Sequence, residues 1–133
     1  HIMGFLNRLR DSFSTELNLS EHWNQPENVS DLDPVFSIND RLSAIFKHSA
    51  ACGTSAFALR NMEEVLSETA ENVDFYIIEV RSQRELSNYV AKKTGVRHES
   101  PQLIIIKNGE ALWNVSHSAI YPKSVLENIS RFT

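Results

Sequence analysis

Residues 45–55 of the chain read Ile45-Phe46-Lys47-His48-Ser49-Ala50-Ala51-Cys52-Gly53-Thr54-Ser55. An apolar run typical of a strand gives way to a short polar loop, and a helical pattern begins just after it. Cys52, the only cysteine of the chain, falls at the start of that helix. The first turn of a helix presents unpaired N–H groups and a partial positive charge. This field favours the thiolate, which is the form that attacks sulfur.

Periodic patterns on both sides of this junction predict alternating strands and helices. Upstream, Trp23 indicates a short first strand, and Ser30 or Asp31 is expected to cap a helical stretch that ends near Ser37. The pattern further predicts strands over residues 41–48, 73–80, 103–106 and 111–115, and helices over residues 53–69, 82–94 and 122–132.

Local signals fix the ends of several of these elements. Ser82 is expected to cap the helix that follows it, and Gly95 to end that helix in a left-handed conformation. Asn108-Gly109 is typical of a two-residue hairpin. The inward face predicted for the helix over residues 53–69 consists of Phe57, Leu59, Met62, Val65 and Leu66.

This order predicts an α/β domain, because parallel strands joined by helices precede an antiparallel hairpin. Such a chain builds a central mixed β-sheet flanked by helices, a three-layer α/β/α sandwich. A cysteine at the second strand-to-helix junction and a proline just before the hairpin form the thioredoxin-like arrangement. We therefore expect a cis peptide bond at Ser100-Pro101, close to Cys52.

Length and composition narrow the function classes. The 133 residues predict one domain over residues 22–133, preceded by an N-terminal segment over residues 1–21 whose first three residues resemble a cloning remnant. A net charge of −4 argues against nucleic acid as a partner, and no apolar run is long enough for a membrane. With one cysteine and scattered histidines, we expect no internal disulfide, no metal site and a cytoplasmic location.

Three separated motifs carry a resemblance to a known family. They are Phe46-Lys47-His48-Ser49, His98-Glu99-Ser100-Pro101-Gln102, and the run from Ile106 to Trp113 followed by Ser116-His117. In this order they resemble the monothiol bacilliredoxins, the YtxJ-like family of thioredoxin-fold proteins. The likeness covers about residues 22–132.

This resemblance implies a thiol–disulfide oxidoreductase. Cys52 matches the active cysteine and Pro101 the cis-proline. The implied reaction removes bacillithiol, or a related low-molecular-weight thiol, from mixed disulfides on client proteins. The small thiol would be a co-substrate rather than a bound cofactor, and the protein would act as a monomer or weak homodimer.

The sequence departs from the family pattern around the cysteine. The family usually shows threonine and a further polar residue, then Cys-Pro-Ile-Ser, whereas this chain has Ala50, Ala51 and then Cys52-Gly53-Thr54-Ser55. Gly53 loosens the helix start, because glycine lacks the fixed φ of proline. The site keeps Ser55 and has no resolving cysteine. We therefore expect it to react with mixed disulfides between a client and a small thiol, and not to reduce disulfides within client proteins directly.

Stabilising the thiolate needs more than the helix field. An ordinary thiol is only about 3% ionised at pH 7, and shifting it to the mostly ionised form takes ~2.7 kcal/mol. A helix terminus supplies ~0.3–1 kcal/mol. We expect the remainder to come from the N–H groups of Thr54 and Ser55 and from the Ser55 hydroxyl.

Other side chains are candidates to support the site. His48 at the strand end could assist the thiol, although local packing competes with that role, and Ser100, His98 and Glu99 are expected beside the proline loop. Strand alternation predicts that Lys47 extends into solvent. A rival hypothesis makes the protein a non-catalytic thioredoxin-fold binding module or redox sensor associated with a stress response. Alkylation of Cys52 as a function of pH separates the two hypotheses, because only an activated thiol reacts readily near neutral pH.

Overall fold

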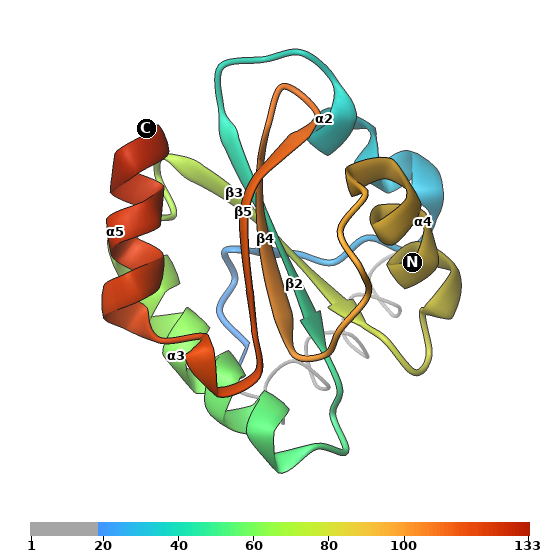
Figure 1. Ribbon diagram of the computed structural model, residues 1–133, viewed down its shortest axis with the longest axis vertical. Helices are drawn as coiled ribbons and strands as arrows, with labels where there is room; N and C mark the ends of the chain where they lie inside the picture. Colours follow the sequence, from blue (N-terminus) through green and yellow to red (C-terminus); the bar gives the residue numbers. More distant parts are fainter. Residues whose placement is uncertain (1–18) are drawn as a thin grey trace, which may run out of the picture.

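A five-stranded mixed sheet forms the centre of the computed structural model, which describes residues 19–133 (Figure 1). The elements in chain order are β1 (Trp23–Asn24), the 3-10 helix η1 (Val29–Leu32), α2 (Asp33–Phe36), β2 (Leu42–His48), α3 (Gly53–Thr69), β3 (Val73–Glu79), α4 (Arg84–Thr94), β4 (Gln102–Lys107), β5 (Glu110–Ser116), the 3-10 helix η2 (His117–Ala119) and α5 (Pro122–Phe132). Most of the expected N-terminal segment, residues 1–18, lies outside the described part of the chain.

The strands are arranged in the order β1-β3-β2-β4-β5. β3 pairs in parallel with both β1 and β2, whereas β4 pairs antiparallel with β2 and β5. The register places His48 of β2 opposite Glu79 of β3, and Lys47 opposite Gln102 of β4. The end of β2, the end of β3 and the start of β4 therefore meet at one edge of the sheet.

Helices cover both faces of the sheet, which gives the three layers predicted from the sequence. In Figure 1, α3 and α5 lie on one side of the sheet, and α2 and α4 lie on the other. Phe46 packs into the core beneath α3 and α5, whereas its neighbour Ile45 packs into the core beneath α2 and α4. All seven residues of β2 are buried because the strand is central and both of its faces are covered.

Most predicted local signals are confirmed. Asn108 and Gly109 have φ values of 53° and 78°, as a type I′ hairpin turn requires, and Gly95 ends α4 with φ of 72°. A Cβ atom at position 109 would lie 2.9 Å from the carbonyl oxygen of Phe36. Glycine is therefore required at this position by both its φ and its close contact.

Three local predictions are wrong. Asn28, rather than Ser30 or Asp31, caps η1, because its side chain accepts the Asp31 N–H in a capping box. Ser82 does not cap α4, since its N–H donates to Glu79 and the helix begins after Gln83. Phe57 is 67% exposed rather than inward-facing.

The peptide bond between Ser100 and Pro101 is cis, as predicted. It immediately precedes β4 at the edge of the sheet where β2 ends. Within residues 19–133, no helix has the length and apolar character needed to cross a membrane.

Candidate active site

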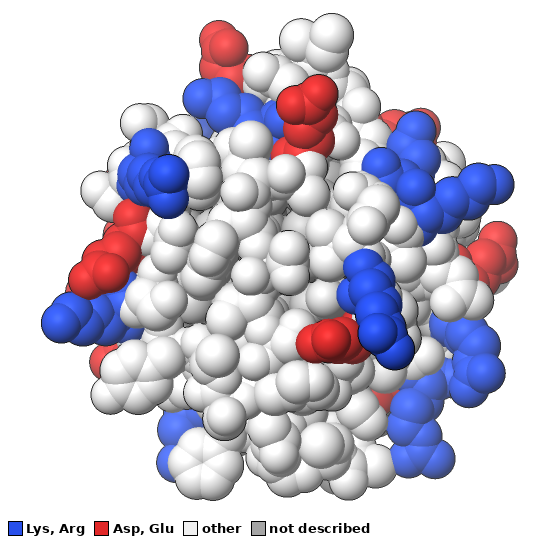
Figure 2. All heavy atoms as spheres, in the orientation of Figure 1, with Lys and Arg blue, Asp and Glu red and all other residues white. Residues whose placement is uncertain are grey.

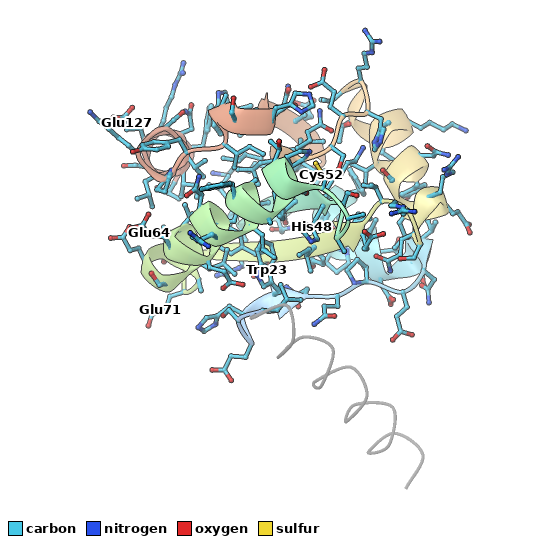
Figure 3. All side chains as sticks on the ribbon, turned by 90° about the horizontal axis from the view of Figure 1, so that it is seen from below. Trp23, His48, Cys52, Glu64, Glu71 and Glu127 are labelled. Atoms are coloured by element: carbon cyan, nitrogen blue, oxygen red, sulfur yellow. The ribbon has the colours of Figure 1, made fainter. Side chains whose placement is uncertain are left out.

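Cys52 is the N-cap residue of α3. Its backbone is extended (φ −110°, ψ 126°), its N–H donates to the Ser49 carbonyl at 3.1 Å, and its carbonyl accepts the Ala56 N–H at 3.1 Å. An N-cap side chain normally places an oxygen where the free N–H groups of the first turn can reach it. Here that position carries a sulfur atom. Figure 3 shows the Cys52 side chain at the N-terminal end of α3, and the residue is half-buried.

The N–H groups of the first turn are free to interact with an anion. Within the part of the chain that the structure describes, the N–H groups of Thr54 and Ser55 form no hydrogen bond, and neither does the sulfur of Cys52. A thiolate at this position gains from the positive end of the helix and from donors that have no competing acceptor. The predicted placement of Cys52 at the start of a helix is therefore confirmed, and its effect on the thiol stays a prediction.

The Ser55 hydroxyl contacts β2 and the loop after it. Ser55 is completely buried, and its oxygen accepts the Ser49 N–H at 2.9 Å and lies 3.0 Å from His48 Nδ1. These contacts fasten the first turn of α3 to the end of β2. A role for this hydroxyl at the sulfur stays a prediction.

His48 ends β2, is only 3% exposed and contacts Ser55 in the first turn of α3; Figure 3 labels it together with Cys52. Burial lowers its pKa, although Glu79 and the contact with Ser55 act in the opposite direction, so the ring is neutral at pH 7. Its Nε2 atom has no hydrogen-bond partner in the described part of the chain. The tautomer with its proton on Nδ1 avoids an unpaired buried N–H, which costs more than an unpaired acceptor. In that tautomer the ring donates to Ser55, and the hydroxyl hydrogen of Ser55 is free.

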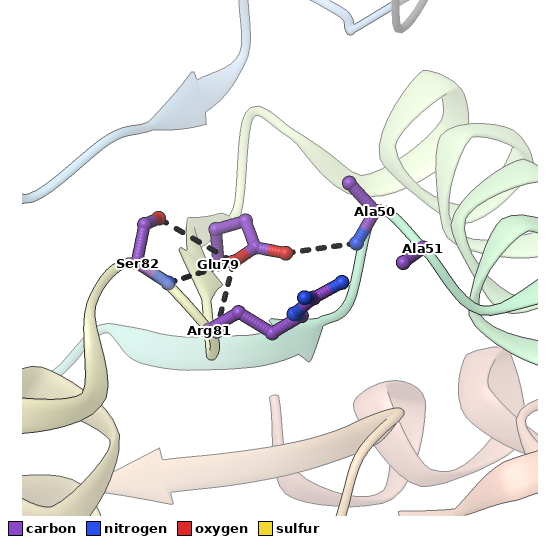
Figure 4. A pocket seen from close by; sticks show the side chains of 5 residues that line it. All are labelled: Ala50, Ala51, Glu79, Arg81 and Ser82. Atoms are coloured by element: carbon purple, nitrogen blue, oxygen red, sulfur yellow. Dashed lines mark hydrogen bonds between the residues drawn. The ribbon is translucent and has the colours of Figure 1, made fainter.

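Glu79 holds the loop that carries the thiol. One carboxylate oxygen accepts the Ala50 N–H at 2.8 Å, and the other accepts the N–H groups of Arg81 at 2.8 Å and Ser82 at 3.0 Å (Figure 4). Partial burial would raise the pKa of Glu79, but the donors at Ala50, Ser82 and Arg81 outweigh it and hold the pKa below its ordinary value. The carboxylate thus joins the end of β3 to the residues just before Cys52.

A shallow hollow of about 580 Å³ opens beside this loop. Its lining residues, drawn in Figure 4, are Ala50, Ala51, Glu79, Arg81 and Ser82. The two alanines immediately precede Cys52 and give the hollow an apolar wall. The hollow therefore lies next to the residues that immediately precede Cys52 in the chain.

Lys47 corrects the sequence prediction that its side chain extends into solvent. The residue is fully buried, and its ammonium nitrogen lies 3.0 Å from His98 Nδ1, which is also 3.0 Å from the Ser87 hydroxyl. Burial lowers the pKa of Lys47 to about 8. Burial, Lys47 and Arg84 together lower the pKa of His98. These contacts connect the His98 ring to Lys47 of β2 and Ser87 of α4.

The proline loop has further contacts with the start of η2. The Pro101 carbonyl accepts the His117 N–H at 2.9 Å, and His117 Nε2 lies 3.3 Å from a carboxylate oxygen of Glu99. Ser100 Oγ is buried with no hydrogen-bond partner in residues 19–133. Of the residues predicted from the sequence, Cys52, Gly53, Thr54, Ser55 and His48 form one cluster, whereas Ser100, Pro101 and His98 belong to the adjacent loop.

Removal of the Ser55 hydroxyl tests the packing beneath the thiol. Ser55→Ala leaves the Ser49 N–H without its acceptor and removes the one hydrogen bond that the His48 ring forms within residues 19–133. We expect the free energy of unfolding to fall by about 1–3 kcal/mol, measured by urea denaturation at pH 7. Ser67→Ala on the exposed side of α3 is the matched control and should change the free energy by less than about 0.5 kcal/mol. Equal effects of the two substitutions would contradict a structural role for the Ser55 contacts.

Comparison with known proteins identifies the family. The sequence matches the monothiol bacilliredoxin BrxC family over residues 24–125. This chain belongs to that family. A solved structure described as a candidate oxidoreductase with a thioredoxin fold is 34% identical to the chain, with a TM-score of 0.70 over 79% of this chain and 91% of that one.

Thioredoxins share the fold of this bacilliredoxin at lower identity. The thioredoxin of Trypanosoma brucei brucei is 19% identical, with a TM-score of 0.64 over 81% of this chain and 88% of its own. A mutant thioredoxin of Halobacterium salinarum NRC-1 is 22% identical, with a TM-score of 0.64 over 84% of this chain and 90% of its own. The thioredoxin fold predicted from the sequence is confirmed, and family and fold together indicate a thiol–disulfide oxidoreductase.

Three features of the site escaped the sequence analysis. They are the buried Lys47, the Glu79 carboxylate and the hollow beside Ala50 and Ala51. Glu79 had a usable signal, because it ends a parallel strand next to β2, and side chains at the carboxyl ends of such strands gather at one edge. Its particular partner, the Ala50 N–H, depends on a loop conformation that no local pattern encodes.

Proposed function

We propose that this bacilliredoxin removes bacillithiol, or a related low-molecular-weight thiol, from mixed disulfides on client proteins. The observation that supports the proposal is the placement of a single half-buried thiol at the free N–H groups of α3. The positive end of a helix favours an anionic sulfur, which is the form that attacks a disulfide.

The proposed reaction is one thiol–disulfide exchange. The Cys52 thiolate attacks the sulfur of the small thiol, so a new sulfur–sulfur bond forms while the bond to the client breaks. The client cysteine leaves as a thiolate and takes a proton from water. A second molecule of the small thiol then attacks the Cys52 adduct and leaves with the first as a symmetric disulfide. The only cysteine of the chain is consumed in the first step, so no internal disulfide can replace this release.

Mass spectrometry tests the proposal directly. A client protein capped with bacillithiol is mixed with the reduced protein, and both are analysed intact after acid quenching. We expect the client to lose the mass of the small thiol and Cys52 to gain it. A client that keeps the mass of the small thiol in the presence of the reduced protein would refute the proposal and favour the binding-module hypothesis.

A further inference from the structure

The charges of the molecule are unevenly distributed. Residues 81–98 contain five exposed cationic side chains and a single carboxylate, Glu85, although the whole chain has a net charge of −4. We call these cations the α4 basic flank: Arg81, Arg84, Lys92, Lys93 and Arg97. Figure 2 shows blue side chains gathered along the side of the molecule that α4 occupies in Figure 1, with few red ones between them.

The charges of the flank are not neutralised within the protein. Among residues 19–133, the guanidinium and ammonium groups of Arg81, Arg84, Lys92 and Arg97 form no ion pair or hydrogen bond. Lys93 makes a cation–π contact with Phe36 at 5.6 Å, which leaves its charge in place. The positive potential of the flank is therefore open to an external partner.

Acidic residues gather at the opposite end of α3. Glu64 and Glu68 lie in the second half of the helix, and Glu71 follows its last turn. Figure 3 shows Glu64 and Glu71 at the end of α3 far from Cys52. These three carboxylates lie far from the thiol, whereas Glu79 and Glu99 lie at the active-site loops and contact Ala50 and His117.

The α4 basic flank borders the loops that surround the thiol. Arg81 lines the hollow together with Ala50 and Ala51 (Figure 4). At the other end of the flank, the Arg97 carbonyl accepts the side-chain amide of Gln102 at 2.9 Å, next to Pro101. A partner that lies on the flank therefore reaches both loops of the active site.

We propose that the α4 basic flank binds acidic protein surface next to the capped cysteine of a client. This inference rests on the proposed function and adds the class of client that the site selects. Complementary charge raises the rate of encounter and orients the partner. An acidic client is attracted to the flank and repelled by the far end of α3, so its capped cysteine arrives beside Cys52.

Peptide binding tests the inference without requiring catalysis. The probes are two fluorescent peptides with one bacillithiol-capped cysteine each, flanked by Asp and Glu in the first and by Lys and Arg in the second. Their binding to the full-length Cys52→Ser protein is followed by anisotropy. We expect the acidic peptide to bind at least about tenfold more tightly at low ionic strength, and this preference to fall below about twofold at 0.5 M salt.

Two double charge-reversal variants show which surface of the protein causes the preference for the acidic peptide. Arg84→Glu combined with Arg97→Glu should remove at least about four-fifths of the tenfold preference. Lys123→Glu combined with Arg131→Glu changes the net charge equally on α5, on the other face of the sheet, and should retain most of it. Equal losses in the two double variants would overturn the inference, because net charge alone would then explain the preference. Tighter binding of a single-stranded oligonucleotide than of the acidic peptide would also overturn it, in favour of nucleic acid.

The same two peptides, mixed with the unsubstituted protein, separate this inference from the proposed function. If the unsubstituted protein uncaps both peptides at equal rates and the Cys52→Ser protein shows no binding preference, the flank inference fails and the proposed function stands. If the acidic preference is present and neither peptide is uncapped, the flank binds acidic protein and the proposed reaction is wrong. Each result is read from a different signal, anisotropy for the flank and peptide mass for the reaction.

Discussion

The Cys52→Ser protein is expected to lose exchange with a bacillithiol-capped client by a factor on the order of a thousand or more. Cys52 is the only cysteine of the chain, so no second thiol can substitute for it. A serine hydroxyl is not ionised near neutral pH and is a far weaker nucleophile than a thiolate. The measurement is the initial rate of client uncapping at pH 7, followed by the mass of the client.

The fold of the Cys52→Ser variant should be unchanged. A serine at this N-cap position places a hydroxyl oxygen near the free N–H groups of Thr54 and Ser55, and such capping stabilises helices by about 1 kcal/mol. If the variant is at least as stable in urea as the wild type and has lost exchange, the loss is due to the missing thiol and not to unfolding. Uncapping by this variant at the wild-type rate would show that another group carries the reaction.

The sequence predicted the elements that local signals specify. The helix over residues 53–69 has the predicted bounds, because its apolar spacing and the glycine after Cys52 are visible in any short window. The hairpin at Asn108-Gly109 and the helix end at Gly95 follow from the few residues that tolerate positive φ. These features need no knowledge of distant parts of the chain.

Features that depend on distant segments were missed. Strand alternation suggested that Lys47 faces solvent, yet the predicted three-layer fold already implied that a central strand is covered on both faces. The argument from the three-layer fold, and not the argument from strand alternation, gives the observed burial of Lys47. Ser55 was expected at the sulfur, and its contact with His48 could not be anticipated because it depends on how the first turn of α3 packs against the end of β2.

Replacement of Lys47 by methionine is expected to stabilise the protein at pH 7 by about 2–3 kcal/mol. Burial lowers the pKa of Lys47 to about 8, whereas a lysine in the unfolded chain titrates near 10.4. Below pH 8 both states are protonated, so the folded state bears the full cost of a buried charge. Methionine has similar length without the charge, and Ser87 remains as a partner for His98 Nδ1.

The lowered pKa of Lys47 also determines how the stabilising effect of Lys47→Met changes with pH. Between pH 8 and about 10.4 the unfolded chain binds more protons than the folded protein, so the contribution of Lys47 makes the wild type more stable as the pH rises. The Lys47→Met protein lacks that contribution. We therefore expect the difference in free energy of unfolding between variant and wild type to shrink by about half or more between pH 7 and pH 9.5, as measured by urea denaturation.

A matched control separates the buried amine from other groups that titrate in this range. Burial and the charge of Asp74 raise the pKa of Tyr76, so its ionisation also affects stability at high pH, but equally in both proteins. Lys107→Met removes a half-exposed lysine at the end of β4 and should change the free energy by less than about 0.5 kcal/mol at either pH. If Lys47→Met destabilises the protein at pH 7, the contact with His98 outweighs the cost of burying the charge. Lys47 would then be a stabilising element of the sheet edge beside Cys52.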